Sequence, residues 1–140
     1  MDFLGKLKPL GLLLLRCAMG IIFISHGFPK LFGQTANWLQ GFSRMGFPPY
    51  FAYIAGVVEF FGGCLLIAGL FTRVAGLLIA GEMAVAIWKV HLAQGIYVVK
   101  NYEFPMVLCA AAFTLATVGA GVLSLDHAIF RGKTRVRSKA

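Results

Sequence analysis

Residues 50–71 read YFAYIAGVVEFFGGCLLIAGLF, and this stretch decides how the rest of the chain is interpreted. Its twenty-two residues carry one ionisable carboxylate, Glu59, and no other charged residue. As a helix rising 1.5 Å per residue it reaches roughly 33 Å, enough to cross a hydrocarbon core of about 30 Å. We therefore interpret it as a membrane-spanning helix. Glu59 then lies near the bilayer midplane, where an unpaired carboxylate costs several kcal/mol.

The composition indicates that the whole chain is a polytopic membrane protein. Of its 140 residues, 59% are hydrophobic and 13% are charged, which leaves too little polar surface to cover a soluble core of this size. The length corresponds to one domain, residues 1–140. The three cysteines have no C-x-x-C spacing, so we expect buried, inert thiols and no redox-active pair.

Three more apolar stretches complete the predicted fold, an all-α bundle of four transmembrane helices. The spans are expected at about 10–28, 50–71, 74–92 and 104–123. Thr72 and Arg73 form so short a turn that the second and third spans must be antiparallel neighbours. In 29–49, apolar residues recur at helical spacing, which predicts a short helix in the membrane interface; an ordinary aromatic belt is the alternative.

The distribution of basic residues predicts the orientation. Five of them lie in the basic tail, 129–140, and with Lys6, Lys8 and Arg73 they place eight positive residues on one side of the membrane. The other side carries four, namely Lys30, Arg44, Lys89 and Lys100. Both termini are therefore expected in the cytoplasm, N-in and C-in. Anionic lipid beside the last span accounts for the basic tail without nucleic acid as a partner.

The ionisable residues in the predicted spans sort into two layers. The inner layer contains Arg16, Glu59 and Glu82, and we expect Arg16 to pair with one of the two carboxylates. One interpretation is an ion-paired bundle core that fixes helix packing. The other is a polar pocket for a small ligand, or a proton path, because charges inside a membrane are often functional. Lys89, seven residues after Glu82 on the same helix face, is interpreted as a compensating partner for it.

The outer layer forms a second candidate site, an outer-mouth cluster of His26, Lys30, His91, Tyr102 and Glu103. Two histidines at similar depth could ligate a haem iron or hydrogen-bond a quinone carbonyl. No residue spacing supports a metal site, so none is predicted. Interface-anchored rings are the simpler alternative for each histidine.

A set of motifs is spread from about residue 12 to residue 126. It consists of Leu15-Arg16, Gly20, Phe23, His26-Gly27, Lys30-Leu31-Phe32-Gly33, Glu59, Gly62-Gly63, Gly69-Leu70, Thr72-Arg73, Met83, His91, Tyr102-Glu103 and Ser124-Leu125-Asp126. Together these residues resemble the pattern of the DoxX family. Members resemble four-helix bacterial inner-membrane proteins, and the family takes its name from subunits of a thiosulfate:quinone oxidoreductase. The family pattern contains the polar positions Arg16, His26, Lys30, Glu59, Arg73, His91 and Glu103; Glu82 and Lys89 lie outside it.

The resemblance implies a multi-pass protein of the bacterial inner (plasma) membrane, acting as an auxiliary subunit of a quinone-linked or oxidative-stress redox system. Quinone is the cofactor that it suggests, and soluble redox enzymes are the partners, with a homo-oligomer as a further alternative. Two other classes of function stay open from the residues themselves. One is a small proton-coupled transporter or carrier, and the other is a non-catalytic membrane anchor for a soluble partner.

Overall fold

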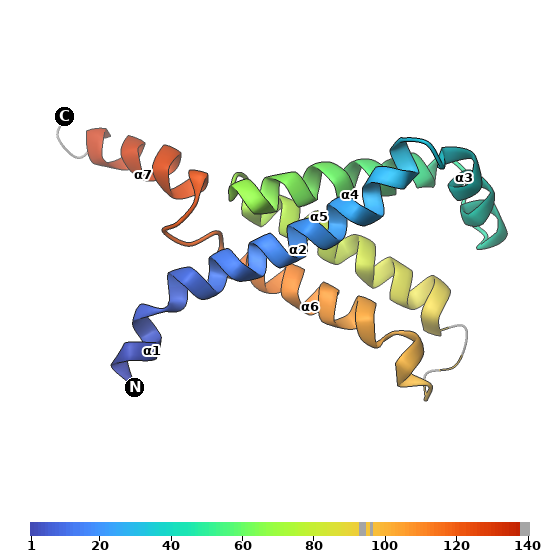
Figure 1. Cartoon of the computed structure of the whole chain (residues 1–140), viewed down its shortest axis with the longest axis horizontal. Helices are drawn as coiled ribbons and strands as arrows, with labels where there is room; N and C mark the ends of the chain where they lie inside the picture. The colour runs from blue at the N-terminus through green and yellow to red at the C-terminus, as the bar shows by residue number, and fades with distance from the viewer. Residues whose placement is uncertain (93–94, 96, 138–140) are drawn as a thin grey trace.

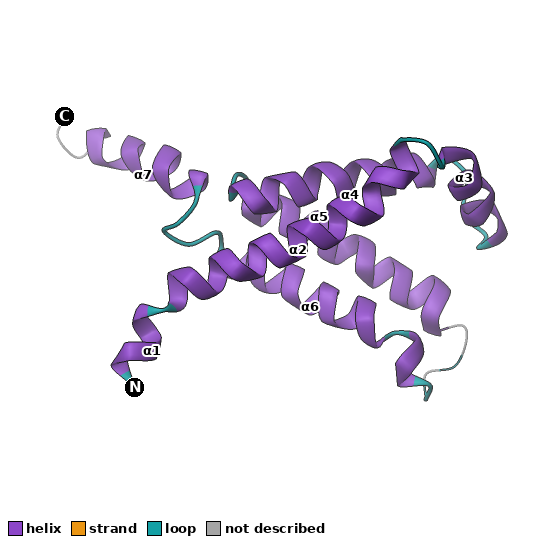
Figure 2. Cartoon of the chain, viewed as in Figure 1, coloured by secondary structure: helices purple, strands orange, loops and turns teal. Residues whose placement is uncertain are grey.

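The computed structural model describes residues 1–92, 95 and 97–137, and every regular element among these residues is helical (Figure 2). The predicted all-α membrane bundle is confirmed. The elements are α1 (Asp2–Lys6), α2 (Lys8–Leu31), α3 (Thr35–Arg44), α4 (Phe51–Ala68), α5 (Thr72–Ala86), η1 (Ile87–His91), η3 (Val99–Asn101), α6 (Glu103–Val118) and α7 (Leu125–Arg137).

Within the described part of the chain, three helical segments are long and apolar enough to cross a membrane, and they correspond to the first three predicted spans. They are Lys8–Leu31, Phe51–Ala68 and Thr72–His91, the last being α5 continued by the π-helical turn η1. The fourth stretch is helical over a shorter length than predicted: α6 has 16 residues and ends at Val118, not at 123. It ends there because Gly119 leaves the helix with φ 90°, a conformation that only glycine adopts readily.

The chain reverses direction through α3 at one end of the bundle, and both termini lie at the opposite end (Figure 1). The short helix predicted within 29–49 is present as α3. The basic tail is mostly the helix α7, which follows the 119–124 segment. The helices α1 and α7 therefore lie at one end of the molecule (Figure 1).

The antiparallel helices α2 and α4 touch backbone to backbone at two pairs of glycines. A Cβ on Gly27 would lie 2.9 Å from the Gly56 carbonyl oxygen, and one on Gly63 would lie 2.8 Å from the Gly20 carbonyl oxygen. Within each helix the two glycines are seven residues apart, so they fall on one face. Small residues of this kind let membrane helices approach closely, because lipid supplies no hydrophobic force to press them together.

The interior is formed by all four of the longer helices, while the outer surface is strongly apolar. Phe23, Leu66, Ile79 and Leu115, one from each of α2, α4, α5 and α6, are almost completely buried in one cluster. Many large apolar side chains point outward, among them Leu14, Ile21, Leu77 and Phe113. Among the residues whose burial is described, four polar or charged ones are buried instead: Arg16, Lys30, Glu59 and Thr72. A bundle surrounded by lipid is expected to have apolar side chains on its outer surface and its charged side chains in the interior.

Candidate functional site

A buried ion pair joins α2 to α4 near the end of the bundle that carries α3. The ammonium of Lys30 donates to Oε2 of Glu59, and the two residues are only 5% and 4% exposed. The lysine Nζ also lies 3.4 Å from the His26 carbonyl oxygen, one turn back on its own helix. The pair is thus enclosed by protein and additionally hydrogen-bonded, the condition under which a buried pair is tolerated.

The glycine contacts between α2 and α4 explain why this pair forms. Lys30 and Glu59 each follow, by three residues, a glycine of the Gly27–Gly56 contact. Residues three apart lie on one face of a helix, so both side chains start at the closest approach of the two backbones. A Cβ on Gly56 would lie 3.0 Å from Lys30 Cβ, which shows how closely the lysine stem follows α4.

Glu82 of α5 adds a third ionisable group to this pair. Its carboxyl group lies next to Glu59 and interacts electrostatically with both Glu59 and Lys30. Its Oε2 is enclosed and has no hydrogen-bond partner among the residues that the structure describes. We refer to Lys30, Glu59 and Glu82 as the charge cluster; it gathers one ammonium and two carboxyl groups from three membrane helices.

The helix α3 covers the charge cluster through Trp38. The Lys30 ammonium lies 4.5 Å from the centre of a Trp38 ring, which is a cation–π contact. The segment that carries this tryptophan is flanked by Gly33 and Gly46, at φ 87° and 84°, where the chain turns sharply into and out of α3. Trp38, which lies in the short helix predicted within 29–49, is therefore part of the wall of the site.

Arg16 is buried at the other end of α2, and the prediction that it pairs with Glu59 or Glu82 is wrong. Its Nη2 donates to the Leu123 carbonyl oxygen at 2.6 Å, and its Nη1 packs on the backbone of Gly69. Arg16 precedes Lys30 by fourteen residues, about 21 Å along a helix, so a different cation occupies the position beside Glu59. Lys30, which was expected at the outer mouth, takes that position.

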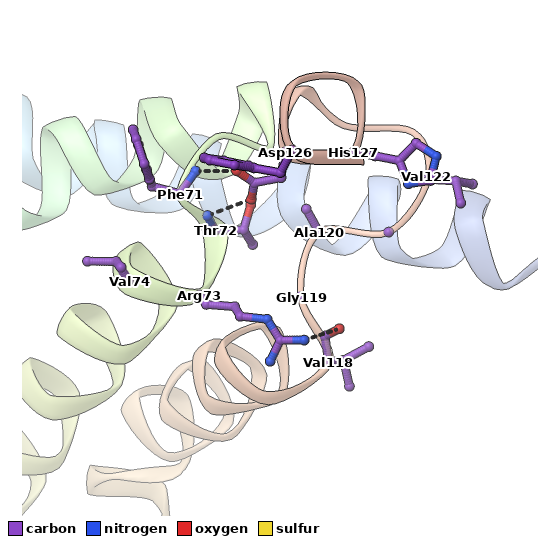
Figure 3. A pocket seen from close by; sticks show the side chains of 12 residues that line it. Phe71, Thr72, Arg73, Val74, Val118, Gly119, Ala120, Val122, Asp126 and His127 are labelled. Atoms are coloured by element: carbon purple, nitrogen blue, oxygen red, sulfur yellow. Dashed lines mark hydrogen bonds between the residues drawn. The ribbon is translucent and has the colours of Figure 1, made fainter. Parts of the chain in front are cut away.

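Two other charged residues join helix ends at the same end as Arg16 (Figure 3). The Asp126 carboxylate accepts hydrogen bonds from the backbone N–H groups of Phe71 and Thr72, at 2.7 and 3.0 Å, and so caps the start of α5. Arg73 donates to carbonyl oxygens in the last turn of α6, with Thr117 at 2.6 Å. A cleft of about 490 Å³ opens between these residues and α7. Asp126 thus holds the turn between α4 and α5, while Arg73 caps the C-terminal end of α6.

The predicted outer-mouth cluster is only partly brought together. His26 is exposed on α2, where its ring centre lies 6.4 Å from that of Phe104, the residue after Glu103. Its Nδ1 lies 2.8 Å from the Ile22 carbonyl oxygen. His91 ends η1, Tyr102 is the residue before α6, and Glu103 is the first residue of α6. Among the residues described, no three His, Cys, Asp or Glu side chains gather as a metal ion would require.

The prediction that Lys89 compensates Glu82 is wrong. The Lys89 ammonium lies 5.7 Å from the centre of the Phe47 ring and 5.8 Å from that of Trp88. The cause is the π-helical turn Ile87–His91, which changes the number of residues per turn just before Lys89. The turn shifts the phase of the helix, and the Lys89 ammonium lies beside these two aromatic rings; the structure describes no contact between it and Glu82.

Long apolar helices packed by glycines around buried charges define a polytopic helical membrane protein. Residues 11–92 match the DoxX family model, and the chain belongs to this family. It is 37% identical over 130 residues to the putative oxidoreductase CatD of Bacillus subtilis, covering 93% of this chain and 95% of that protein. It is 30% identical to the inner membrane protein YqjF of Escherichia coli, covering 87% of this chain and 94% of that one.

A second Escherichia coli relative, the inner membrane protein YphA, is 33% identical over 90% of this chain and 94% of its own length. The chain is thus a multi-pass protein of the inner membrane. No solved structure matches it.

Sequence reasoning missed the partner of Glu59, although a pattern that could have found it is present. Gly27-Phe-Pro-Lys30 and Gly56-Val-Val-Glu59 each place a charge three residues after a glycine, on two neighbouring and oppositely directed helices. Opposite charges beside a glycine contact are well placed to meet. The predicted depth of each residue in the membrane pointed instead to Arg16, because Arg16 and Glu59 were assigned to the inner layer and Lys30 to the outer layer. The long lysine side chain can reach from one layer to the other.

Proposed function

We propose that this protein is a membrane subunit of a quinone-linked redox system, and that the charge cluster binds the polar edge of the quinone ring. The observation that carries the proposal is the Lys30–Glu59 ion pair with Glu82 beside it, inside the membrane-spanning bundle. Ionisable groups at such depth are expensive and are by default functional. A purely structural role would be served as well by apolar packing between α2 and α4.

The chemistry of the charge cluster fits both redox forms of a quinone. An oxidised quinone presents carbonyl oxygens, which accept hydrogen bonds from an ammonium such as that of Lys30. A reduced quinol presents hydroxyl groups, which donate to carboxylates such as those of Glu59 and Glu82. One ammonium beside two carboxyl groups therefore offers a partner to the ligand before and after its reduction.

Aromatic rings at sequence positions adjoining Lys30 and Glu59 supply a surface for an apolar ring that arrives from the lipid. Phe28, Phe32 and Phe60 contact one another at centroid distances of 5.1 to 6.2 Å. Phe28 lies in α2 and Phe32 is the residue that caps the C-terminal end of this helix. The side chains of both are about half exposed. A lipid-soluble ligand can approach such a surface sideways, and aromatic rings favour stacked or edge-on contacts with it.

The relatives support a redox role. A protein that matches 93% of this chain bears the description putative oxidoreductase. Because the charge cluster contains no redox-active group of its own, we propose that a soluble redox enzyme supplies or receives the electrons, and that this chain presents the quinone to it.

Binding of a quinone can be tested by the fluorescence of Trp38, which lies over Lys30. The chain has two tryptophans, so Trp88→Phe leaves Trp38 as the sole emitter. This variant, purified in nanodiscs, is titrated with a short-chain ubiquinone and a short-chain menaquinone. We expect saturable quenching that Glu59→Gln weakens at least about tenfold, equivalent to roughly 1.4 kcal/mol.

Two controls separate specific binding from random collision in the lipid. Trp38→Phe leaves only the exposed Trp88, whose quenching should rise without saturation. Lys89→Met removes a lysine that does not belong to the charge cluster and should leave the Trp38 titration unchanged. Non-saturating quenching of Trp38 in every variant would show that the charge cluster does not bind quinone.

A further inference from the structure

We infer that the charge cluster is a proton-binding site that holds one exchangeable proton between Glu59 and Glu82. The inference concerns the charge cluster itself and does not depend on the identity of any redox ligand. Its first basis is the number of charges: Lys30 supplies one positive charge, whereas two ionised carboxylates supply two negative ones. Without a further cation the cluster has a net charge of −1 inside a membrane, which is costly.

No other cationic side chain of the described residues compensates this charge. Arg16 is bonded to the Leu123 carbonyl oxygen at the far end of α2. Lys89 is directed to the rings of Phe47 and Trp88. His26 is exposed, with Nδ1 at the carbonyl oxygen of Ile22 on its own helix. The missing positive charge must therefore come from a bound cation.

The contacts within the charge cluster indicate where this cation sits. Lys30 donates to Oε2 of Glu59, while the enclosed Oε2 of Glu82 has no donor among the described residues. From α6, the Cys109 thiol lies 3.4 Å from the Ala80 carbonyl oxygen and does not serve Glu82. A proton on either carboxyl group turns one of two facing acceptors into a donor for the other.

A proton fits this position better than a metal cation does. Sodium would need several oxygen ligands around one point. The oxygens known here are those of two carboxyl groups and the His26 carbonyl, and two of them, Glu59 Oε2 and the His26 oxygen, already accept from Lys30. A proton needs only two facing oxygens. The structure thus assigns to Glu82, which lies outside the family pattern, a role as the second acceptor of a proton shared with Glu59.

The test is infrared spectroscopy of the purified chain in nanodiscs near neutral pH, in H₂O and D₂O. A protonated carboxyl group has a C=O stretching band that is separate from carboxylate bands and shifts in D₂O. We expect this band in the wild type, and we expect Glu82→Gln and Glu59→Gln each to abolish it. Either change leaves one carboxylate for one ammonium, which requires no additional proton. Glu103→Gln, an exposed control, should keep the band.

Lys30→Met makes the opposite and more specific prediction. Without the ammonium both carboxyl groups must be protonated to remain neutral, so the band should increase about twofold. The wild type is measured with sodium and with an organic cation in its place. Absence of the band under both conditions overturns the inference, and so does a band that sodium removes, since sodium would then be the bound cation. Because these two measurements use the unmodified protein, a variant that fails to fold does not weaken the test.

Discussion

Lys30 and Glu59 meet because each lies one helical turn beyond a glycine at which α2 and α4 touch. The Gly27–Gly56 contact brings the two backbones so close that a Cβ on Gly27 would lie 2.5 Å from the Phe60 nitrogen. Helix packing and the buried ion pair are therefore one feature of the fold. A change in either the glycines or the charges should affect both stability and the site.

Loss of one partner of the ion pair should destabilise the protein strongly. Lys30→Met leaves Glu59 buried without its cation, and we expect a loss of roughly 3–5 kcal/mol in the free energy of unfolding. Adding Glu59→Gln to this variant should recover most of the loss. Denaturant titration in mixed micelles, followed by circular dichroism, measures both. Lys8→Met, at an exposed position of the same helix, is the control and should have little effect.

Arg16→Leu should behave differently, because Arg16 bonds to a backbone carbonyl and not to a glutamate. We expect this variant to be destabilised and Glu59→Gln to give it no rescue. The same titration compares the single and double variants. Recovery of stability by Glu59→Gln would show that Arg16 does pair with Glu59, contrary to the structure.

Replacing a contact glycine should separate α2 from α4. Gly27→Ala places a methyl group 2.5 Å from a backbone nitrogen, so the helices must move apart, at a cost of about 1–3 kcal/mol. Gly11→Ala is a matched control on the same helix, because a Cβ there meets nothing within 4 Å. It should be neutral or slightly stabilising, since alanine favours the helix. Equal effects of the two changes would argue against the packing described.

Asp126 should contribute to stability as a helix cap. Asp126→Ala removes the acceptor for the N–H groups of Phe71 and Thr72, and loss of such a cap costs about 0.5–2 kcal/mol. The expected loss is tested by measuring the free energy of unfolding of Asp126→Ala. Asp2→Ala, a change at an exposed residue in the first turn of α1, is the control. If Asp126→Ala and Asp2→Ala are equally harmless, the turn between α4 and α5 does not depend on this cap.

The sequence predicted the class of fold, but not the partners of the charged residues. Apolar length defined α2, α4 and α5 because the thickness of the bilayer fixes how many residues a span needs. The partner of Glu59 depends on which helices are neighbours and on how far a lysine side chain extends along the next helix. Lys89 was misassigned because a π-helical turn changes the phase of a helix without a distinctive sequence pattern.

The orientation is a prediction of the positive-charge bias, with eight basic residues on one side and four on the other. Reporter fusions at Ala140 and within 34–37 should report opposite compartments, with the C-terminus in the cytoplasm. Figure 1 shows why these two positions are informative, since α3 and the C-terminal helix lie at opposite ends of the bundle. The same compartment for both fusions would contradict the four-span arrangement.

The most direct test of a functional charge cluster is to separate its effect on folding from its effect on binding. The variant Lys30→Met/Glu59→Gln removes the ion pair and leaves Glu82 as the one carboxyl group of the cluster. With its proton bound, Glu82 carries no charge, so the fold of this variant should be close to that of the wild type. Saturable quenching of Trp38 by a short-chain quinone is then measured in this variant and in the wild type. We predict that unfolding returns to near the wild-type midpoint while quinone affinity falls at least about tenfold. A folded double variant that binds quinone as tightly as the wild type would contradict the account.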